Sequence, residues 1–144
     1  MDIVFRTASP ENAEELAMLR VEAMRPSLEA VGRFDRDRAR RRFLDTYIPS
    51  DTIIIQQQTA IVGFYVVRQK PNELYLDHLY VRDDCQGFGI GSRVITKIKA
   101  DAAKKGLAIG LNALKGSAAN EFYQSHGFRL VKVEEFDNQY VWNP

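Results

Sequence analysis

The stretch LYVRDDCQGFGIGSRVI, residues 79–95, places three glycines at alternate positions between a strand-like run and a helix-like run. Glycine loses more conformational freedom on folding than any other residue, so this cluster indicates backbone that something must approach closely. Consecutive backbone N–H groups at the start of a helix form a nest that binds phosphate, and the helix dipole adds to the attraction. We therefore expect an anion-binding turn over residues 86–92.

Two other phosphate-binding motifs fit this turn less well. A dinucleotide-binding unit requires an acidic residue about 20 positions further on, and the next strand-like run, LAIGLNAL (107–114), contains no acid. A P-loop requires Gly-Lys-Ser/Thr after the glycines, and that triplet is absent. Taken alone, the turn also remains compatible with a tight strand-to-helix connection that binds nothing.

Composition limits the class of protein. The chain has 144 residues, 45% of them apolar, a formal net charge of +1 and one cysteine, Cys85. This length predicts a single domain over residues 1–144, and the charge balance predicts neither a nucleic-acid nor a membrane partner. One cysteine allows no internal disulfide, and neither a signal peptide nor a membrane-spanning run is evident. We expect a cytoplasmic protein.

The order of elements predicts an α/β protein. Strand-like runs cover residues 3–8, 52–58, 60–69, 73–81, 107–114, 128–136 and 138–143, and helical periodicity covers 10–24, 35–48, 90–105 and 117–127. Pro26 should kink or break the first helix just after Met24. One crossover surrounds the glycine turn, so we expect a mixed, mostly antiparallel sheet of about seven strands with about four helices. The last strand, NQYVWN, offers an edge that could pair across a homodimer.

Two blocks of the sequence resemble the signatures of the GCN5-related N-acetyltransferase (GNAT) family. The run QGFGIG resembles the family's Gln/Arg-x-x-Gly-x-Gly/Ala motif, and NALKGSAANEFYQSHGF (112–128) resembles its Asn-x-x-Ala/Glu-x-x-x-Tyr-x-x-x-Gly-Phe ending. The element order agrees over the whole chain. The matching residues are Gln86, Gly89, Gly91, Asn120, Tyr123, Gly127 and Phe128.

The resemblance implies the acyl-CoA N-acyltransferase (GNAT) fold with splayed central strands, and acetyl-CoA as cosubstrate without a metal. It implies an enzyme that moves the acetyl group to a primary amine of a small molecule or amino acid by direct attack. A peptide or protein amine as acceptor, or a catalytically silent CoA-binding or regulatory module, remains the alternative. The residues expected to bind the cofactor are Leu79, Tyr80, Val81, Gln86, Gly87, Phe88, Gly89, Ile90, Gly91, Ser92, Asn112, Asn120 and Tyr123.

The chemistry of acetyl transfer selects further candidates. In the strand ELYLDHLYV (73–81) the apolar phase changes at Asp77-His78, which predicts a β-bulge and an unpaired backbone N–H near Leu79. We interpret that N–H as the oxyanion donor. By resemblance, the Tyr123 hydroxyl protonates the leaving sulfur, although a helical tyrosine is also a common core residue. Asp77 and His78 are candidate bases, with ordered water as the alternative.

The remaining candidates lie outside that strand. Arg25, Glu29, Phe34 and Asp35 surround the expected join of the first two helices, which overhangs the acceptor groove in this fold, and a small-molecule amine suits such a mixed set. Asn112 could face the cofactor or be a satisfied structural amide, and Asn120 could bind the pantetheine arm or cap local backbone. We interpret His126 as a cation that complements the dipole at a helix C-terminus.

Overall fold

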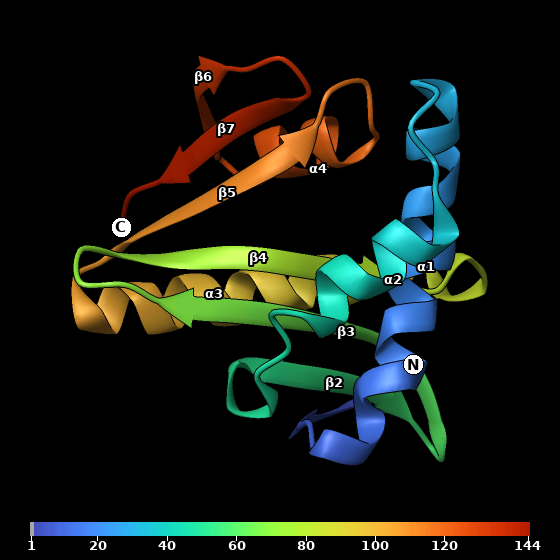
Figure 1. Ribbon diagram of the computed structural model, residues 1–144. Helices are drawn as coiled ribbons and strands as arrows, with labels where there is room; N and C mark the ends of the chain where they lie inside the picture. The colour runs from blue at the N-terminus through green and yellow to red at the C-terminus, as the bar shows by residue number, and fades with distance from the viewer. Residues whose placement is uncertain (1) are drawn as a thin grey trace. The chain divides into compact units, whose positions relative to one another are not determined.

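The computed structural model describes residues 2–144, and Figure 1 follows the chain from blue to red. The described residues form seven strands in the order β1-β2-β3-β4-β5-β7-β6 and four α-helices, which confirms the predicted mixed sheet. The elements are β1 Val4–Thr7, α1 Ala13–Ala30, α2 Arg36–Leu44, β2 Thr52–Gln57, β3 Ala60–Gln69, β4 Glu73–Val81, α3 Ile90–Lys105, β5 Ala108–Leu114, α4 Ala119–Ser125, β6 Arg129–Val133 and β7 Asp137–Trp142. None of the described helices has both the length and the apolar character needed to cross a membrane.

The chain contacts divide into two units. Unit 1 comprises the described residues up to Val66 together with His78–Ile90, and unit 2 comprises Val67–Asp77 and Gly91–Pro144. In unit 1, β1 pairs antiparallel with β2, and β2 with β3. The core of unit 1 joins α1, α2 and these strands because the apolar residues of α1 recur at helical spacing. Its buried members are Ala8, Leu16, Ala17, Phe43, Ile54, Ile61, Phe64 and Val66.

Helix α1 continues through Pro26 to Ala30, so the predicted break after Met24 is wrong. Proline removes one N–H donor but does not prevent the residues after it from completing another turn. The helix ends instead at Gly32, whose φ of 70° lies in the left-handed region. The next residue, Arg33, donates its N–H to the carbonyl of Leu28 at 2.9 Å, as in a Schellman motif.

In unit 2, β4 and β5 pair in parallel from Glu73↔Ala108 to Leu76↔Leu111, which is the pairing expected at the crossover. Strand β5 also pairs antiparallel with β7, and β7 with β6, so the three lie side by side in Figure 1. Both edges of β7 are therefore occupied within the chain. The prediction that the C-terminal strand NQYVWN pairs across a dimer is wrong, because β6 rather than β7 ends the sheet.

The predicted change of phase at Asp77-His78 is also wrong. Leu74, Leu76 and His78 are all buried, so the alternation of β4 continues through the histidine. The imidazole packs against aromatic rings of unit 1, with ring centroids 5.4 Å from Phe43 and 6.4 Å from Phe64. The neighbouring ladder contains an irregularity, where Ile55 pairs with Gly63 but Gln56 pairs with Ile61.

Candidate functional site

The glycine turn of unit 1 has the backbone conformation that its sequence predicts. Gly87 and Gly89 have φ values of 86° and 79°, which disfavour any residue with a β-carbon. No atom lies within 4 Å of the position that a β-carbon would occupy on either glycine. The turn follows a short 3-10 turn at Asp83–Cys85 and leads directly into α3 at Ile90.

Backbone donors remain available in this turn. Among the described residues, none accepts a hydrogen bond from the backbone N–H of Gly87, Phe88 or Gly89. The first N–H groups of α3 also have no acceptor inside the helix, as at any helix start. A phosphate-binding nest requires small residues that leave the backbone open, together with several N–H groups that have no acceptor.

The side chain of Gln86 stabilises this turn through hydrogen bonds to nearby residues. Its side-chain amide donates to the carbonyl of Val81 at 3.0 Å and to a carboxylate oxygen of Asp83 at 3.4 Å. Arg82 forms an ion pair with Asp84 at 2.6 Å in the same segment. Cys85 is buried, and burial raises the pKa of its thiol. The side chain of Gln86 therefore holds the loop in shape through its amide group.

Gly91 and Ser92 belong to unit 2, where packing explains the glycine. A β-carbon on Gly91 would lie 3.1 Å from the Cζ atom of Phe122, so the glycine lets the α4 side chain approach α3. The Ser92 hydroxyl lies 3.1 Å from Nε2 of His126. The sequence indicated a ligand contact at Gly91, and the structure adds a packing requirement.

His126 is not the helix-terminal cation that the sequence predicted. Burial, and secondly the nearby positive charge of Lys99, lowers the pKa of His126 below its usual value of 6.5, which favours the neutral form of the ring. Its ring lies 4.7 Å from that of Phe122. The cation at this helix end is Lys99, which donates a hydrogen bond to the His126 carbonyl.

Asn120 caps local backbone, which was one of its two predicted roles. Its amide N–H₂ donates to the carbonyls of Leu114 at 2.9 Å and Ser117 at 3.0 Å. Its oxygen accepts from the amide of Asn138 at 3.0 Å and the hydroxyl of Tyr140 at 2.8 Å. Both ends of the side chain are thus engaged in joining β5, α4 and β7.

Two other residues predicted on the cofactor side lie in contrasting places in unit 2. Asn112 is exposed on β5, opposite Gln139 of β7. Tyr123 is 7% exposed, and its ring contacts those of Phe122 and Phe128 edge to face, with centroids 5.2 and 5.6 Å away. The ring of Tyr123 therefore has a core role whatever its hydroxyl does.

The candidate bases both have partners. Asp77 forms an ion pair with Arg68 at 3.2 Å within unit 2. In unit 1, Nδ1 of the buried His78 lies 3.0 Å from the Tyr80 hydroxyl. Both side chains therefore already interact with other groups of the chain.

The residues predicted around the join of α1 and α2 are partly brought together. Arg25 forms an ion pair with Glu29 at 3.4 Å, and its guanidinium lies 5.0 Å above the ring of Phe34. Asp35 caps α2 by accepting the N–H of Arg38 at 3.0 Å, and that bond lowers the pKa of the Asp35 carboxyl. Asp35 thus has a structural role in addition to the predicted contact with substrate.

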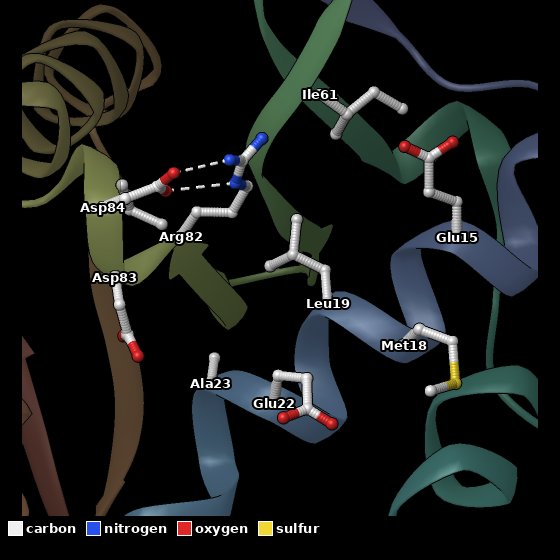
Figure 2. A pocket seen from close by; sticks show the side chains of 10 residues that line it. Glu15, Met18, Leu19, Glu22, Ala23, Ile61, Arg82, Asp83 and Asp84 are labelled. Carbon is white, nitrogen blue, oxygen red and sulfur yellow. Dashed lines mark hydrogen bonds and ion pairs between the residues drawn. The ribbon is translucent and has the colours of Figure 1, made fainter.

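A pocket that sequence reasoning did not predict lies in unit 1, and we call it the α1 pocket. It has a volume of about 490 Å³, and Figure 2 shows the side chains of α1 facing those that follow β4. The available signal was a stripe on α1 with i, i+3, i+4, i+7 spacing, beside the buried stripe. The lining residues are Glu15, Met18, Leu19, Glu22, Ala23, Ile61, Val81, Arg82, Asp83 and Asp84. No group of three or more potential metal ligands is placed to hold an ion within residues 2–144.

Comparisons with solved structures agree on the fold. The PaiA N-acetyltransferase of Thermoplasma acidophilum, solved with coenzyme A, matches with a TM-score of 0.79 and 16% identity, covering 100% of both chains. An acetyltransferase of Thermus thermophilus matches with a TM-score of 0.78 and 18% identity, covering 100% of this chain and 98% of that one. The N-acetylglutamate synthase of Neisseria gonorrhoeae, solved with coenzyme A and N-acetyl-glutamate, matches with a TM-score of 0.72 and 16% identity, covering 99% of this chain and 35% of that one.

Sequence comparison identifies the family. No curated protein matches the sequence significantly. The family model described as an acetyltransferase (GNAT) domain matches residues 22–144, which includes the glycine turn and the segment around Tyr123. The chain therefore belongs to the GCN5-related N-acetyltransferase family, whose acetyl donor is acetyl-CoA.

Proposed function

We propose that this acetyltransferase moves the acetyl group of acetyl-CoA to a primary amine of a small molecule by direct attack. The observation that carries the proposal is the glycine turn, where two left-handed glycines leave a row of backbone donors open at the start of α3. A pyrophosphate needs such donors, and the family supplies the reaction. On this proposal, residues 86–92 bind the pyrophosphate of acetyl-CoA.

The reaction needs three functions at the thioester. The amine nitrogen attacks the carbonyl carbon, and the backbone N–H of Leu79 stabilises the oxyanion that forms. The carbon–sulfur bond then breaks, and the Tyr123 hydroxyl gives its proton to the departing thiolate. These two assignments rest on the family resemblance, because the alternation of buried residues in β4 continues through His78.

We assign removal of the amine proton to water. Asp77 is held by Arg68, and His78 is buried among aromatic rings with its Nδ1 at the Tyr80 hydroxyl. Ordered water can carry the proton from the amine to bulk solvent. On this assignment, no side chain has to act as the general base. Arg25, Glu29 and Phe34 remain proposed contacts for the acceptor near the join of α1 and α2.

A thiol-release assay tests the proposed function. The purified chain is incubated with acetyl-CoA and a panel of small primary amines, amino acids and short peptides, and free CoA thiol is measured over time. Release that depends on a small amine supports the proposal, and mass spectrometry should show one acetyl group added to that amine. CoA binding without amine-dependent release would identify a silent CoA-binding module, and release with peptides alone would identify a peptide acetyltransferase.

A further inference from the structure

Exposed apolar side chains gather on β6 and the turn that follows it. Of the nine large hydrophobic residues that are exposed in the described chain, four lie between positions 130 and 136. They are Leu130, Val131, Val133 and Phe136, and Val133 is 59% exposed. Apolar residues that gather in one short segment indicate an interaction surface, whereas exposed apolar residues that are scattered singly do not.

The same strand forms one edge of the sheet. Among the described strands β6 pairs only with β7, so the other side of its backbone is open (Figure 1). An open edge can accept a further strand, and natural proteins often protect it with a lysine or a bulge. Strand β6 has both, namely Lys132 and an irregularity between Leu130 and Lys132. Any strand that pairs with this edge must accommodate these two features.

The irregularity places the apolar side chains of β6 on one face of the sheet. Leu130 pairs with Tyr140, and Val133 pairs with Asn138. Tyr140 and Asn138 are two residues apart on β7, so they lie on one face, and their partners on β6 lie on that face with them. In a regular strand, two residues three positions apart would lie on opposite faces.

The charged side chains of β6 share the opposite face. Arg129 pairs with Val141 and Lys132 with Gln139, which are also two residues apart on β7. Glu134 lies on this face too, because its carboxylate accepts a hydrogen bond from the Gln139 amide. In the described part of the chain, no acidic side chain forms an ion pair with Arg129 or Lys132. The charged face of β6 therefore begins with an unpaired arginine and ends with an acid.

A second copy of β6 fits both faces of this edge. In an antiparallel pair, residues directly opposite each other lie on the same face of the sheet. If Leu130 lies opposite Val133 of the second copy, Arg129 lies opposite Glu134 of the second copy. The two-fold axis repeats both pairs. Four apolar side chains then meet on one face, and two pairs of opposite charge form on the other.

The bulge makes this register possible. A two-fold axis perpendicular to the sheet keeps every side chain on its own face, so two positions that pair across the axis must share a face within one copy. Leu130 and Val133 meet this condition only because the bulge adds one residue between them. A shift of one residue would place Lys132 opposite Lys132 of the second copy, and like charges directly opposite each other destabilise a sheet.

We propose that the chain forms a symmetric dimer in which β6 pairs antiparallel with β6 of a second copy. In this dimer Leu130 lies opposite Val133 and Arg129 lies opposite Glu134, so the sheets of the two copies join into one continuous sheet. The inference does not depend on acetyl transfer, because it rests only on the edge of the sheet.

The molecular mass in solution tests the proposal. Sedimentation equilibrium of the native chain should show a reversible, concentration-dependent transition from 16.4 kDa to twice that mass. Arg129→Glu places acid opposite acid in both charge pairs, so it should raise the dissociation constant of the dimer at least about tenfold. The position is exposed, and circular dichroism should show that the variant is folded.

A second charge reversal tests the register. Adding Glu134→Arg to Arg129→Glu exchanges the two charges and keeps the pair, so this double variant should recover the native dissociation constant. Adding Glu135→Arg to Arg129→Glu is the matched control. It gives the same net charge, but Glu135 does not lie opposite position 129 in this register, so the dimer should stay weak.

Leu130→Lys tests the apolar face. It replaces two of the four apolar side chains by cations and should dissociate the dimer. Val4→Lys is its control, because Val4 is an exposed apolar residue of β1, at the other end of the sheet. This control should leave the dissociation constant unchanged.

Four results would overturn the proposal. The first is a native chain that stays monomeric at every concentration, which would leave β6 to a different partner chain. The second is a folded Arg129→Glu variant that associates as tightly as the native chain. The third is equal recovery with Glu134→Arg and Glu135→Arg. The fourth is dissociation by Val4→Lys alone, which would assign the interface to β1.

Discussion

A β-carbon on Gly63 would lie 2.4 Å from the backbone carbonyl oxygen of Tyr80, so only glycine fits at this point of β3. The bulge in the ladder between β2 and β3 lies beside it, and the N–H of Arg82 donates to the carbonyl of Val62 at 2.8 Å. The absence of a β-carbon at Gly63 therefore lets β3 lie close to the β4 segment that precedes the glycine turn.

Gly63→Ala should destabilise the protein by about 1–3 kcal/mol, because the added methyl group meets backbone that cannot rotate away. Gly110→Ala is the matched control. There the β-carbon would meet a carboxylate oxygen of Glu73 at 2.7 Å, and a flexible side chain can move aside. Urea denaturation should show the larger loss for Gly63→Ala, and equal losses would contradict the close approach of β3 to β4.

Gly89→Val should weaken CoA binding at least tenfold, or about 1.4 kcal/mol, because valine is strained at a φ of 79° and the turn must rearrange. Gly106→Val introduces the same strain at a φ of 67°, at the end of α3. Calorimetry with CoA should separate the two variants, while thermal melting shows similar losses of stability. Native CoA affinity in a folded Gly89→Val protein would remove the basis for the pyrophosphate site.

Tyr123→Phe should lower kcat by about 10²–10⁴-fold, the usual contribution of a positioned proton donor. The ring contacts with Phe122 and Phe128 should survive, because only the hydroxyl is lost. CoA affinity should therefore change little. A normal kcat, measured together with the melting temperature on one preparation, would assign Tyr123 to the core alone.

His126 should make the protein less stable in mild acid. Its folded pKa lies below 6.5, so between that value and the folded pKa the unfolded chain binds more protons than the folded one. Stability is then lost as the pH falls through this window, and it is independent of His126 above about pH 7. His126→Gln should flatten the decline in unfolding free energy between about pH 7 and pH 5, measured in urea. An unchanged slope would contradict the burial of the ring.

Local patterns in the sequence determined the order of elements and the glycine turn. Alternation, helical spacing and turn residues act over a few positions, so seven strands, four helices and the left-handed Gly87 and Gly89 could be predicted. The same local reasoning treated His78 as polar and Pro26 as a breaker. The first was wrong because aromatic neighbours from α2 and β3 bury the imidazole of His78. The second was wrong because the helix continues past Pro26 and ends at the cap formed by Gly32.

Only the tertiary structure decided which partner each polar group meets. Asn120 accepts a hydrogen bond from Tyr140, twenty residues later in the chain. The Ser92 hydroxyl lies at hydrogen-bond distance from Nε2 of His126, thirty-four residues later. The α1 pocket likewise depends on bringing residues 15–23 to Ile61 and to residues 81–84. Hydrogen bonds and burial operate through space, and a buried imidazole or a paired carboxylate has a different pKa from the same residue in an extended chain. The availability of an acid or a base could therefore not be obtained from the order of residues alone.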